Sequence, residues 1–150
     1  MSNLNFSING KSIRPTLYEG KTRQFTIAVD EPETLGGKDS FPNPVEYILA
    51  GYAGCLNVVL NLVAKEKNIQ LNDIKINIEG DINPAKFLGF SEKERAGFQF
   101  LNVYIDIDSP SSDQEIDELI HVVKERCPVN DNLSHPTPIN YFITTNTILN

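Results

Sequence analysis

The feature that most constrains this chain is a long apolar run over residues 43–68. Asn43 is a good helix N-cap, and Pro44 suits the first helical position because its missing N–H is not needed there. Glu46 completes a capping box. Residues 47–64 are apolar on nearly all sides of the expected helix. We therefore predict a core helix that is surrounded by protein on most sides.

The same run is close in length to a membrane span, which needs roughly 18 apolar residues or more. Gly51, Gly54, Asn57 and Asn61 interrupt it, and a buried asparagine is costly in lipid. The rest of the chain has the patterns of half-buried strands and amphipathic helices. We therefore predict no membrane span.

Length and charge limit the class of protein. The 150 residues are enough for one domain with its own core, so we expect residues 1–150 to form a single domain. The net charge of -7 argues against nucleic acid or an anionic membrane as a partner. No secretion signal is recognisable at the amino terminus, and we expect a cytoplasmic protein. In that compartment a cysteine pair is more often catalytic or redox-active than a permanent cross-link.

The residues before the long helix predict a three-stranded meander. Apolar and polar residues alternate over 4–8, and Asn9-Gly10 is typical of a hairpin turn. Further strands are expected at 12–18 and 24–29. Residues 30–42 contain two prolines and a Gly-Gly pair, so they predict a loop.

Two strands and an irregular segment should follow the long helix. Residues 74–78 and 98–107 alternate between apolar and polar, which is the pattern of a strand with one wet face. Residues 83–97 have no regular period, yet they include Phe87 and Phe90. This segment is either a loop folded back on the core or a pocket wall or subunit contact.

The last third predicts a second helix and a closing strand. Ser112 and Glu115 form a capping box, and apolar residues then recur at helical spacing to about Arg126. A final strand is expected over about 139–148. Several strands and two main helices indicate an α+β fold.

The two cysteines are the candidates for chemistry. Pro128 follows Cys127 directly, so a short helix beginning there would place the Cys127 sulfur among free N–H groups, a setting that lowers the pKa of a thiol. Cys55 lies in the third turn of its helix and would need a nearby cation. From spacing alone, Cys55 is better explained as an inert buried thiol, which is the common fate of cysteine.

Other kinds of site find little support. Cys55, Cys127, His121 and His135 do not have the short spacings of structural zinc ligands, so no metal is expected. No Gly-x-Ser-x-Gly motif of a serine hydrolase occurs.

The chain resembles the OsmC/Ohr proteins, named for osmotically inducible protein C and the organic hydroperoxide resistance proteins. The likeness extends from about Lys21 to the end. It is carried by Asn43-Pro44-x-Glu46-Tyr47, Ala50-Gly51-Tyr52-Ala53-Gly54-Cys55 and Cys127-Pro128-Val129-Asn130.

The resemblance implies an OsmC-like fold, with antiparallel sheets packed around a central buried helix in an intertwined homodimer. It also implies thiol-dependent reduction of organic hydroperoxides or hydrogen peroxide at the subunit interface. Cys55 would form a sulfenic acid and Cys127 would resolve it as a disulfide. No cofactor is expected, but an external dithiol must reduce the disulfide. The alternative is a non-catalytic dimer that binds a small apolar ligand at its interface.

Two family positions differ here. The family glutamate directly follows the Asn-Pro pair, where this chain has Val45, and Glu46 comes one residue later. Glu46 is nine positions from Cys55, which is about 900 degrees of turn and roughly 13 Å of rise, so the two lie on opposite faces. We expect Glu46 to cap the helix, and we keep it as a candidate catalytic residue.

The family also uses an arginine near the amino terminus to stabilise the thiolate. Lys11 stands nearest that position, and Arg14 is close by in the same hairpin. We select Arg14 because a planar guanidinium can contact a carboxylate and a thiolate together.

Overall fold

The computed structural model describes residues 1–146 and has an α+β architecture of two antiparallel sheets and three α-helices. In chain order the elements are β1 (Asn9–Arg14), β2 (Leu17–Thr22), β3 (Phe25–Val29), the 3-10 turn η1 (Glu33–Leu35), α1 (Pro44–Glu66), β4 (Asp73–Ile82), β5 (Phe98–Asp108), α2 (Asp113–Arg126) and α3 (Pro128–Ser134).

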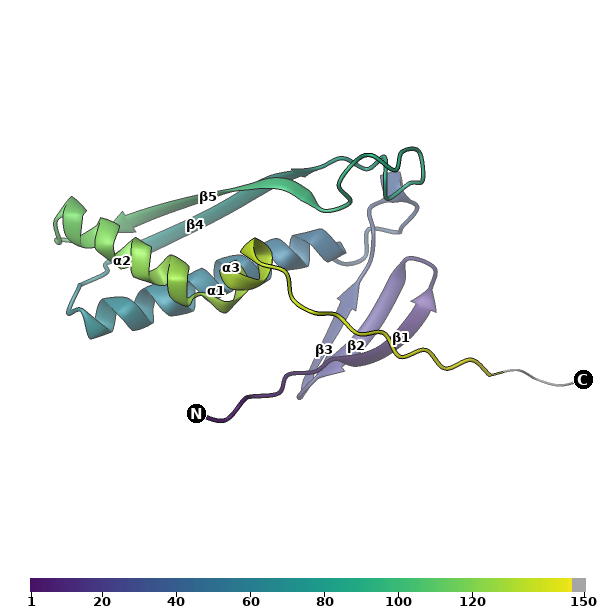
Figure 1. Cartoon of the computed structure of the whole chain (residues 1–150), viewed down its shortest axis with the longest axis horizontal. Helices are drawn as coiled ribbons and strands as arrows, with labels where there is room; N and C mark the ends of the chain where they lie inside the picture. The colour runs from purple at the N-terminus through teal and green to yellow at the C-terminus, as the bar shows by residue number, and fades with distance from the viewer. Residues whose placement is uncertain (147–150) are drawn as a thin grey trace, which may run out of the picture.

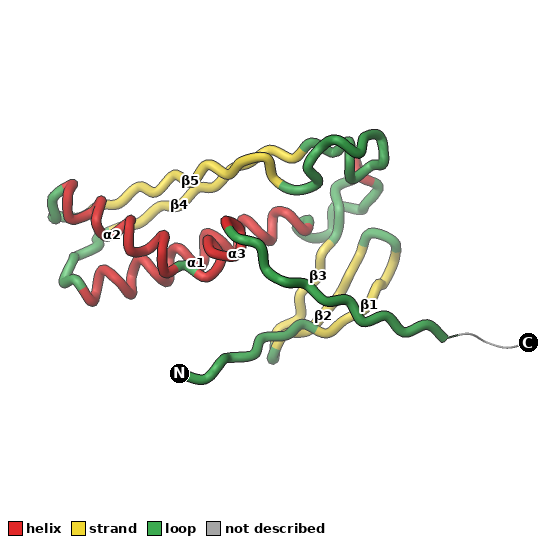
Figure 2. Tube along the Cα trace, in the orientation of Figure 1, coloured by secondary structure: helices red, strands yellow, loops and turns green. Residues whose placement is uncertain are grey.

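The elements form two groups (Figure 1). The long β4–β5 hairpin lies along α1 and α2, and α3 follows α2 beside the middle of α1 (Figure 2). The β1–β2–β3 sheet stands to one side, near the start of α1. The hydroxyl of Tyr47 links the groups by donating a hydrogen bond of 2.7 Å to the carbonyl of Ala28 on β3.

The predicted start of α1 is confirmed. The backbone N–H of Glu46 donates to Asn43 Oδ1 at 2.9 Å, and the N–H of Asn43 donates to Glu46 Oε2 at 2.9 Å. This reciprocal pair satisfies N–H groups that a helix start otherwise leaves free. The capping box of Ser112 and Glu115 at α2 is confirmed in the same way.

The core lies where α1, α2 and the inner face of the β4–β5 hairpin meet. The alternating isoleucines of both strands pack against it, with Ile76 opposite Ile105. Each fully buried leucine or valine contributes about 1.5–3 kcal/mol through loss of contact with water. The most deeply buried core side chains are Leu56, Leu60, Val63, Leu119, Val123 and Cys127.

The meander has the predicted number of strands but different boundaries. The Asn9-Gly10 hairpin turn is wrong, because both residues belong to β1 and the turn lies at Pro15 and Thr16. Gly10 pairs with Gly20 of β2, and a Cβ atom on Gly10 would lie 2.5 Å from the Gly20 Cα. The glycine therefore allows close approach of two strands rather than a reversal of the chain.

The predicted closing strand is also wrong within the described residues. Residues 139–146 have no strand structure, and the remainder of the predicted strand, 147–148, lies outside the described residues. A strand needs a partner for its backbone groups, and none of the strands in the described chain pairs with this segment.

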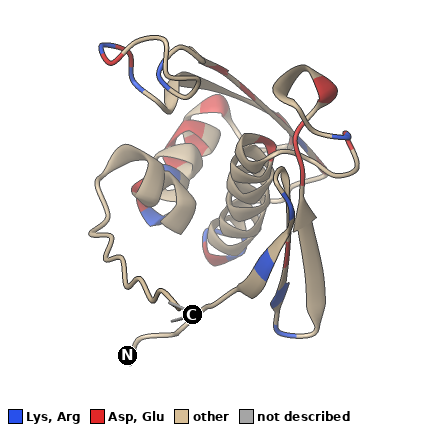
Figure 3. Ribbon diagram, turned by 90° about the vertical axis from the view of Figure 1, so that its right-hand side faces the viewer, with Lys and Arg blue, Asp and Glu red and all other residues tan. Residues whose placement is uncertain are grey.

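The prediction that protein surrounds α1 holds for one side only. Ile48, Val58 and Leu62 are exposed in the single chain, Val58 to 63%. Figure 3 shows the middle of α1 free of charged residues. By length and composition α1 could cross a membrane, but its buried side chains form the core with α2.

Candidate active site

The two cysteines meet across the helical layer. Cys55 is the twelfth residue of α1, about three turns from its start, and Cys127 links the end of α2 to the start of α3. Their Sγ atoms are 3.1 Å apart, and the Cys127 thiol donates to the Cys55 sulfur. Both are free thiols. A small rearrangement is enough to join them.

Cys127 caps α3 as the sequence indicates, with Pro128 at the first helical position. The backbone N–H of Asn130 donates to the Cys127 sulfur at 3.4 Å. The expected lowering of the pKa is nevertheless wrong. Burial raises the pKa of Cys127, and the hydrogen bond that the thiol donates to Cys55 raises it further. The helix start opposes these effects but does not overcome the removal of water.

The thiols therefore differ in access to solvent and in hydrogen bonding. Cys55 is half-buried and accepts a hydrogen bond from the Cys127 thiol. Cys127 is fully buried and holds its proton more tightly. This arrangement suits Cys55 as the sulfur that attacks an external reagent and Cys127 as an internal partner.

A tyrosine and an asparagine complete the surroundings of the thiols, and sequence reasoning missed both roles. Tyr52, one turn before Cys55, donates from its hydroxyl to Asn130 Oδ1 at 2.7 Å. Burial, and then the neighbouring thiols Cys127 and Cys55, raise the pKa of Tyr52. The spacing of Tyr52 and Cys55, three residues apart, places them on one helix face and could have drawn attention to the tyrosine.

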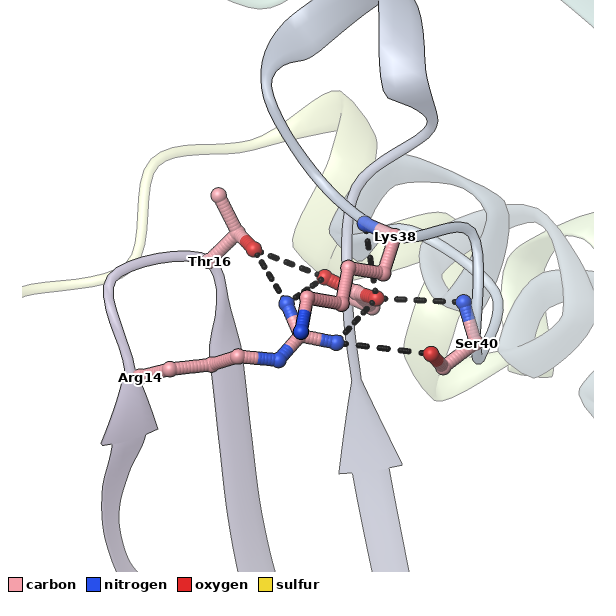
Figure 4. A network of polar contacts seen from close by, with 5 residues as sticks. Arg14, Thr16, Lys38 and Ser40 are labelled. Carbon is pink, nitrogen blue, oxygen red and sulfur yellow. Dashed lines mark hydrogen bonds and ion pairs between the residues drawn. The ribbon is translucent and has the colours of Figure 1, made fainter.

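Arg14 is the last residue of β1 and lies in a different cluster (Figure 4). Its Nη1 and Nη2 donate to the two carboxylate oxygens of Asp30 at 3.2 and 2.9 Å. Thr16 and the backbone N–H of Ser40 also donate to that carboxylate, at 2.8 and 3.1 Å. The Arg14 guanidinium is the main cause that holds the pKa of Asp30 well below its usual range.

The structure brings Cys55 and Cys127 together but leaves the other predicted site residues apart from them. Arg14 is bonded to Thr16, Asp30 and Ser40. None of the hydrogen bonds in the described chain joins Cys55 to a Lys or Arg side chain. Asp30 is the partner that sequence reasoning missed, because no local spacing links it to Arg14.

The remaining candidates have structural settings. Glu46 serves the capping box of α1, and Lys11 is exposed on β1 opposite Glu19. His121 and His135 are exposed and lie beside acidic residues of their own helical turns. Within residues 1–146, no group of three or more His, Cys, Asp or Glu side chains could hold a metal ion.

The sequence is similar to proteins named for hydroperoxide reduction. A hydroperoxide reductase of Mycoplasma genitalium is 37% identical over 94 residues, which is 61% of this chain and 61% of that protein. A hydroperoxide reductase of Mycoplasma pneumoniae is 32% identical over 110 residues, which is 73% of each chain. The match therefore spans less than two thirds of the M. genitalium protein.

Solved structures share the fold, and a family model covers most of the chain. An OsmC-like protein from M. pneumoniae is 25% identical with a TM-score of 0.77 over 90% of this chain and 91% of that one. An organic hydroperoxide resistance protein from Elizabethkingia anophelis is 26% identical with a TM-score of 0.61 over 88% and 91%. The model for OsmC-like protein matches residues 37–142. The chain belongs to the OsmC-like protein family.

Proposed function

We propose that this protein is a thiol-dependent peroxidase that reduces organic hydroperoxides. The observation that carries the proposal is the pair of sulfurs 3.1 Å apart, one half-buried and one fully buried. A peroxide can reach the half-buried Cys55 sulfur, and the Cys127 sulfur lies next to it. The names of the M. genitalium and M. pneumoniae relatives support the same chemistry.

The proposed reaction has two oxidative steps and a final reduction that restores the two thiols. The Cys55 thiolate attacks one oxygen of the peroxide, the O–O bond breaks, and the other oxygen leaves as an alcohol after taking up a proton. Cys55 is then a sulfenic acid. The Cys127 sulfur attacks the Cys55 sulfur, and the hydroxyl leaves with the Cys127 proton as water. An external dithiol reduces the resulting disulfide by exchange and is itself oxidised to a disulfide.

We further propose that the protein acts as a homodimer. The extended ends of the chain carry exposed aromatic residues, among them Phe6 at 84% and Phe142 at 94%, and Val58 leaves an apolar face on α1. Large exposed apolar areas mark interaction sites. Because Arg14 does not contact Cys55 within one chain, its proposed support of the thiolate requires Arg14 of one subunit to approach Cys55 of the other.

A cytoplasmic location and a catalytic role for Glu46 are further proposals. A reduced compartment such as the cytoplasm would keep the thiol pair ready for reaction. The capping box already accounts for the position of Glu46, and its replacement by Gln would test whether it contributes to turnover.

A thiol titration tests the peroxidase proposal. Addition of cumene hydroperoxide to the reduced protein should remove both free thiols together. Cys55→Ser should block this loss. Cys127→Ser should allow Cys55 to oxidise further, to the sulfinic acid, which mass spectrometry detects as added oxygen. Unreacted thiols in the wild-type protein would contradict the proposal.

One observation favours the alternative, a dimer that binds a small apolar ligand. A cavity of about 550 Å³ lies between the start of α1 and the 83–97 segment, with Leu35, Val45, Ile82 and Phe87 in its walls. Glu31 also lines it, and its Oε2 is buried without a hydrogen-bond partner in the described chain. Pro84, Phe87 and Ala96 of the 83–97 segment line this cavity, which supports the interpretation of that segment as a pocket wall. Unreacted thiols in the titration would favour this second function.

A further inference from the structure

Asn130 connects three helices around the thiol pair. Its backbone N–H donates to the Cys127 sulfur at 3.4 Å. Its side-chain Oδ1 accepts from the Tyr52 hydroxyl on α1 at 2.7 Å, and its Nδ2 donates to the Lys124 carbonyl in the last turn of α2 at 2.9 Å. One residue of α3 therefore holds the sulfur, the helix that carries Cys55, and the end of α2.

These bonds fix a position that the backbone leaves adjustable. Cys127 is at once the C-cap of α2 and the N-cap of α3, in an extended conformation with φ −77° and ψ 113°. A residue between two helices moves whenever either helix shifts. The bond from Asn130 to Lys124 joins α3 to α2, and it also satisfies a carbonyl at the end of α2 that the helix itself leaves free.

The hydrogen bond that Tyr52 donates to Asn130 links α1 to α3. Tyr52 lies three residues before Cys55 and therefore on the same face of the helix. It is buried, so its hydroxyl has little water to replace Asn130 as a partner. Among the hydrogen bonds of the described chain, this bond and the thiol contact itself are the ones that join α1 to the Cys127–Asn130 segment.

We propose that Tyr52 and Asn130 are positioning residues that hold Cys127 beside Cys55 for closure of the disulfide. This inference rests on the proposed function and deepens it. In the step concerned, the Cys127 sulfur bonds to the Cys55 sulfur, the S–O bond of the sulfenic acid breaks, and the hydroxyl takes the Cys127 proton to leave as water. The Asn130 N–H offsets part of the cost of placing charge on the buried Cys127 sulfur.

The first half of the reaction does not use this link. Attack of Cys55 on a peroxide requires access to Cys55, and neither Tyr52 nor Asn130 needs to move for it. Loss of the link should therefore separate the two halves: formation of the sulfenic acid continues, while closure of the disulfide slows. A general loss of packing would slow both.

The test measures the two steps separately in Tyr52→Phe and Asn130→Ala. After rapid mixing with cumene hydroperoxide, sulfenic acid is trapped with dimedone and the disulfide is followed by mass spectrometry. We expect unchanged formation of the sulfenic acid and closure slowed about twofold to tenfold, the value of one neutral hydrogen bond. More of Cys55 should then proceed to the sulfinic acid.

Two further variants control for other causes. Tyr104→Phe also removes a tyrosine hydroxyl with a hydrogen-bond partner, in this case Glu79 at 3.0 Å on the exposed face of the β4–β5 hairpin, and should leave closure unchanged. The double variant Tyr52→Phe with Asn130→Ala should close no more slowly than Asn130→Ala alone, because both changes remove the same bond.

Closure driven by diamide, a thiol oxidant, keeps this inference separate from the peroxidase proposal. Diamide joins the two thiols without a sulfenic acid, and both variants should again close more slowly than the wild type. Equal rates for variants and wild type would overturn the positioning role. If the wild-type protein closes with diamide but not with peroxide, the peroxidase proposal is wrong, and slower closure in the variants still supports the positioning role.

Discussion

Asp30 and Cys127 are both fully buried, yet their surroundings differ in kind. The Asp30 carboxylate receives hydrogen bonds from Arg14, Thr16 and two backbone N–H groups, so its charge is fully matched. Cys127 receives one N–H and gives its own proton to Cys55. A buried charge needs a complete set of partners to be stable, whereas a neutral thiol tolerates a sparse environment.

The comparison separates a cluster that holds the fold from one that is free to react. Every strong donor around Asp30 is occupied, and a change there should appear first in stability. In the thiol pair, Cys55 is half-buried and a single hydrogen bond joins the two sulfurs. Substitutions there should appear first in activity.

The largest expected effect is that of Cys55→Ser on turnover. Peroxide reduction should fall at least about 1,000-fold, because removal of a nucleophile leaves only residual catalysis. The melting temperature should stay near that of the wild type, since serine has nearly the shape of cysteine. A coupled assay with a dithiol and cumene hydroperoxide measures the first quantity, and calorimetry the second. Retained turnover would remove Cys55 from the mechanism.

Asp30→Asn should act first on stability. It leaves the partly buried Arg14 side chain without its counterion, so we expect the melting temperature to fall on the order of 10 °C. Asp106→Asn is the matched control, because Asp106 is exposed on β5 and its replacement should change stability little. If Asp30→Asn melts like the control, the Arg14 cluster does not stabilise the fold.

Acid should weaken the same cluster. The folded pKa of Asp30 lies below its unfolded value, so its contribution is fully present above the unfolded pKa of about 3.9 and is lost progressively as pH falls below that value. The difference in melting temperature between the wild type and Asp30→Asn should therefore be constant from neutral pH to about pH 5 and shrink further into acid. A constant difference at pH 3 would contradict this assignment.

How much the sequence predicts depends on how far apart the interacting residues are. Asn43 and Glu46 interact within one turn, and Pro128 directly follows the cap residue Cys127, so local spacing was enough to place the helix starts. The isoleucines of β4 and β5 showed their inner face by alternation alone. The meeting of Cys55 and Cys127 came from the family resemblance, not from their spacing.

The failures share a dependence on distant partners. The bond from Arg14 to Asp30 spans 16 positions and that from Tyr52 to Asn130 spans 78, and no local pattern encodes either. Asn9-Gly10 resembled a turn because Asn-Gly is common in hairpin turns. The pairing of Gly10 with Gly20 depends on strand register, which the local sequence does not show. Residues 139–146 are rich in β-branched and aromatic residues, as strands are, but none of the strands in the described chain pairs with them.

Alkaline pH provides the smallest and most specific test of the comparison. Burial raises the pKa of the Cys127 thiol, so the folded state keeps its proton more firmly than the unfolded state does. Stability from this source is fully present below the unfolded thiol pKa of about 8.5 and is lost as pH rises through the folded value. Above pH 8.5 the melting temperature of the wild type should therefore fall faster than that of Cys127→Ser, measured in the presence of a reductant that keeps the thiols free.

The two clusters would then weaken at opposite ends of the pH scale, the carboxylate in acid because it must stay charged and the thiol in base because it must stay neutral. Parallel curves for wild type and Cys127→Ser would mean that the sulfur is hydrated in solution, and the contrast between the two clusters would be lost.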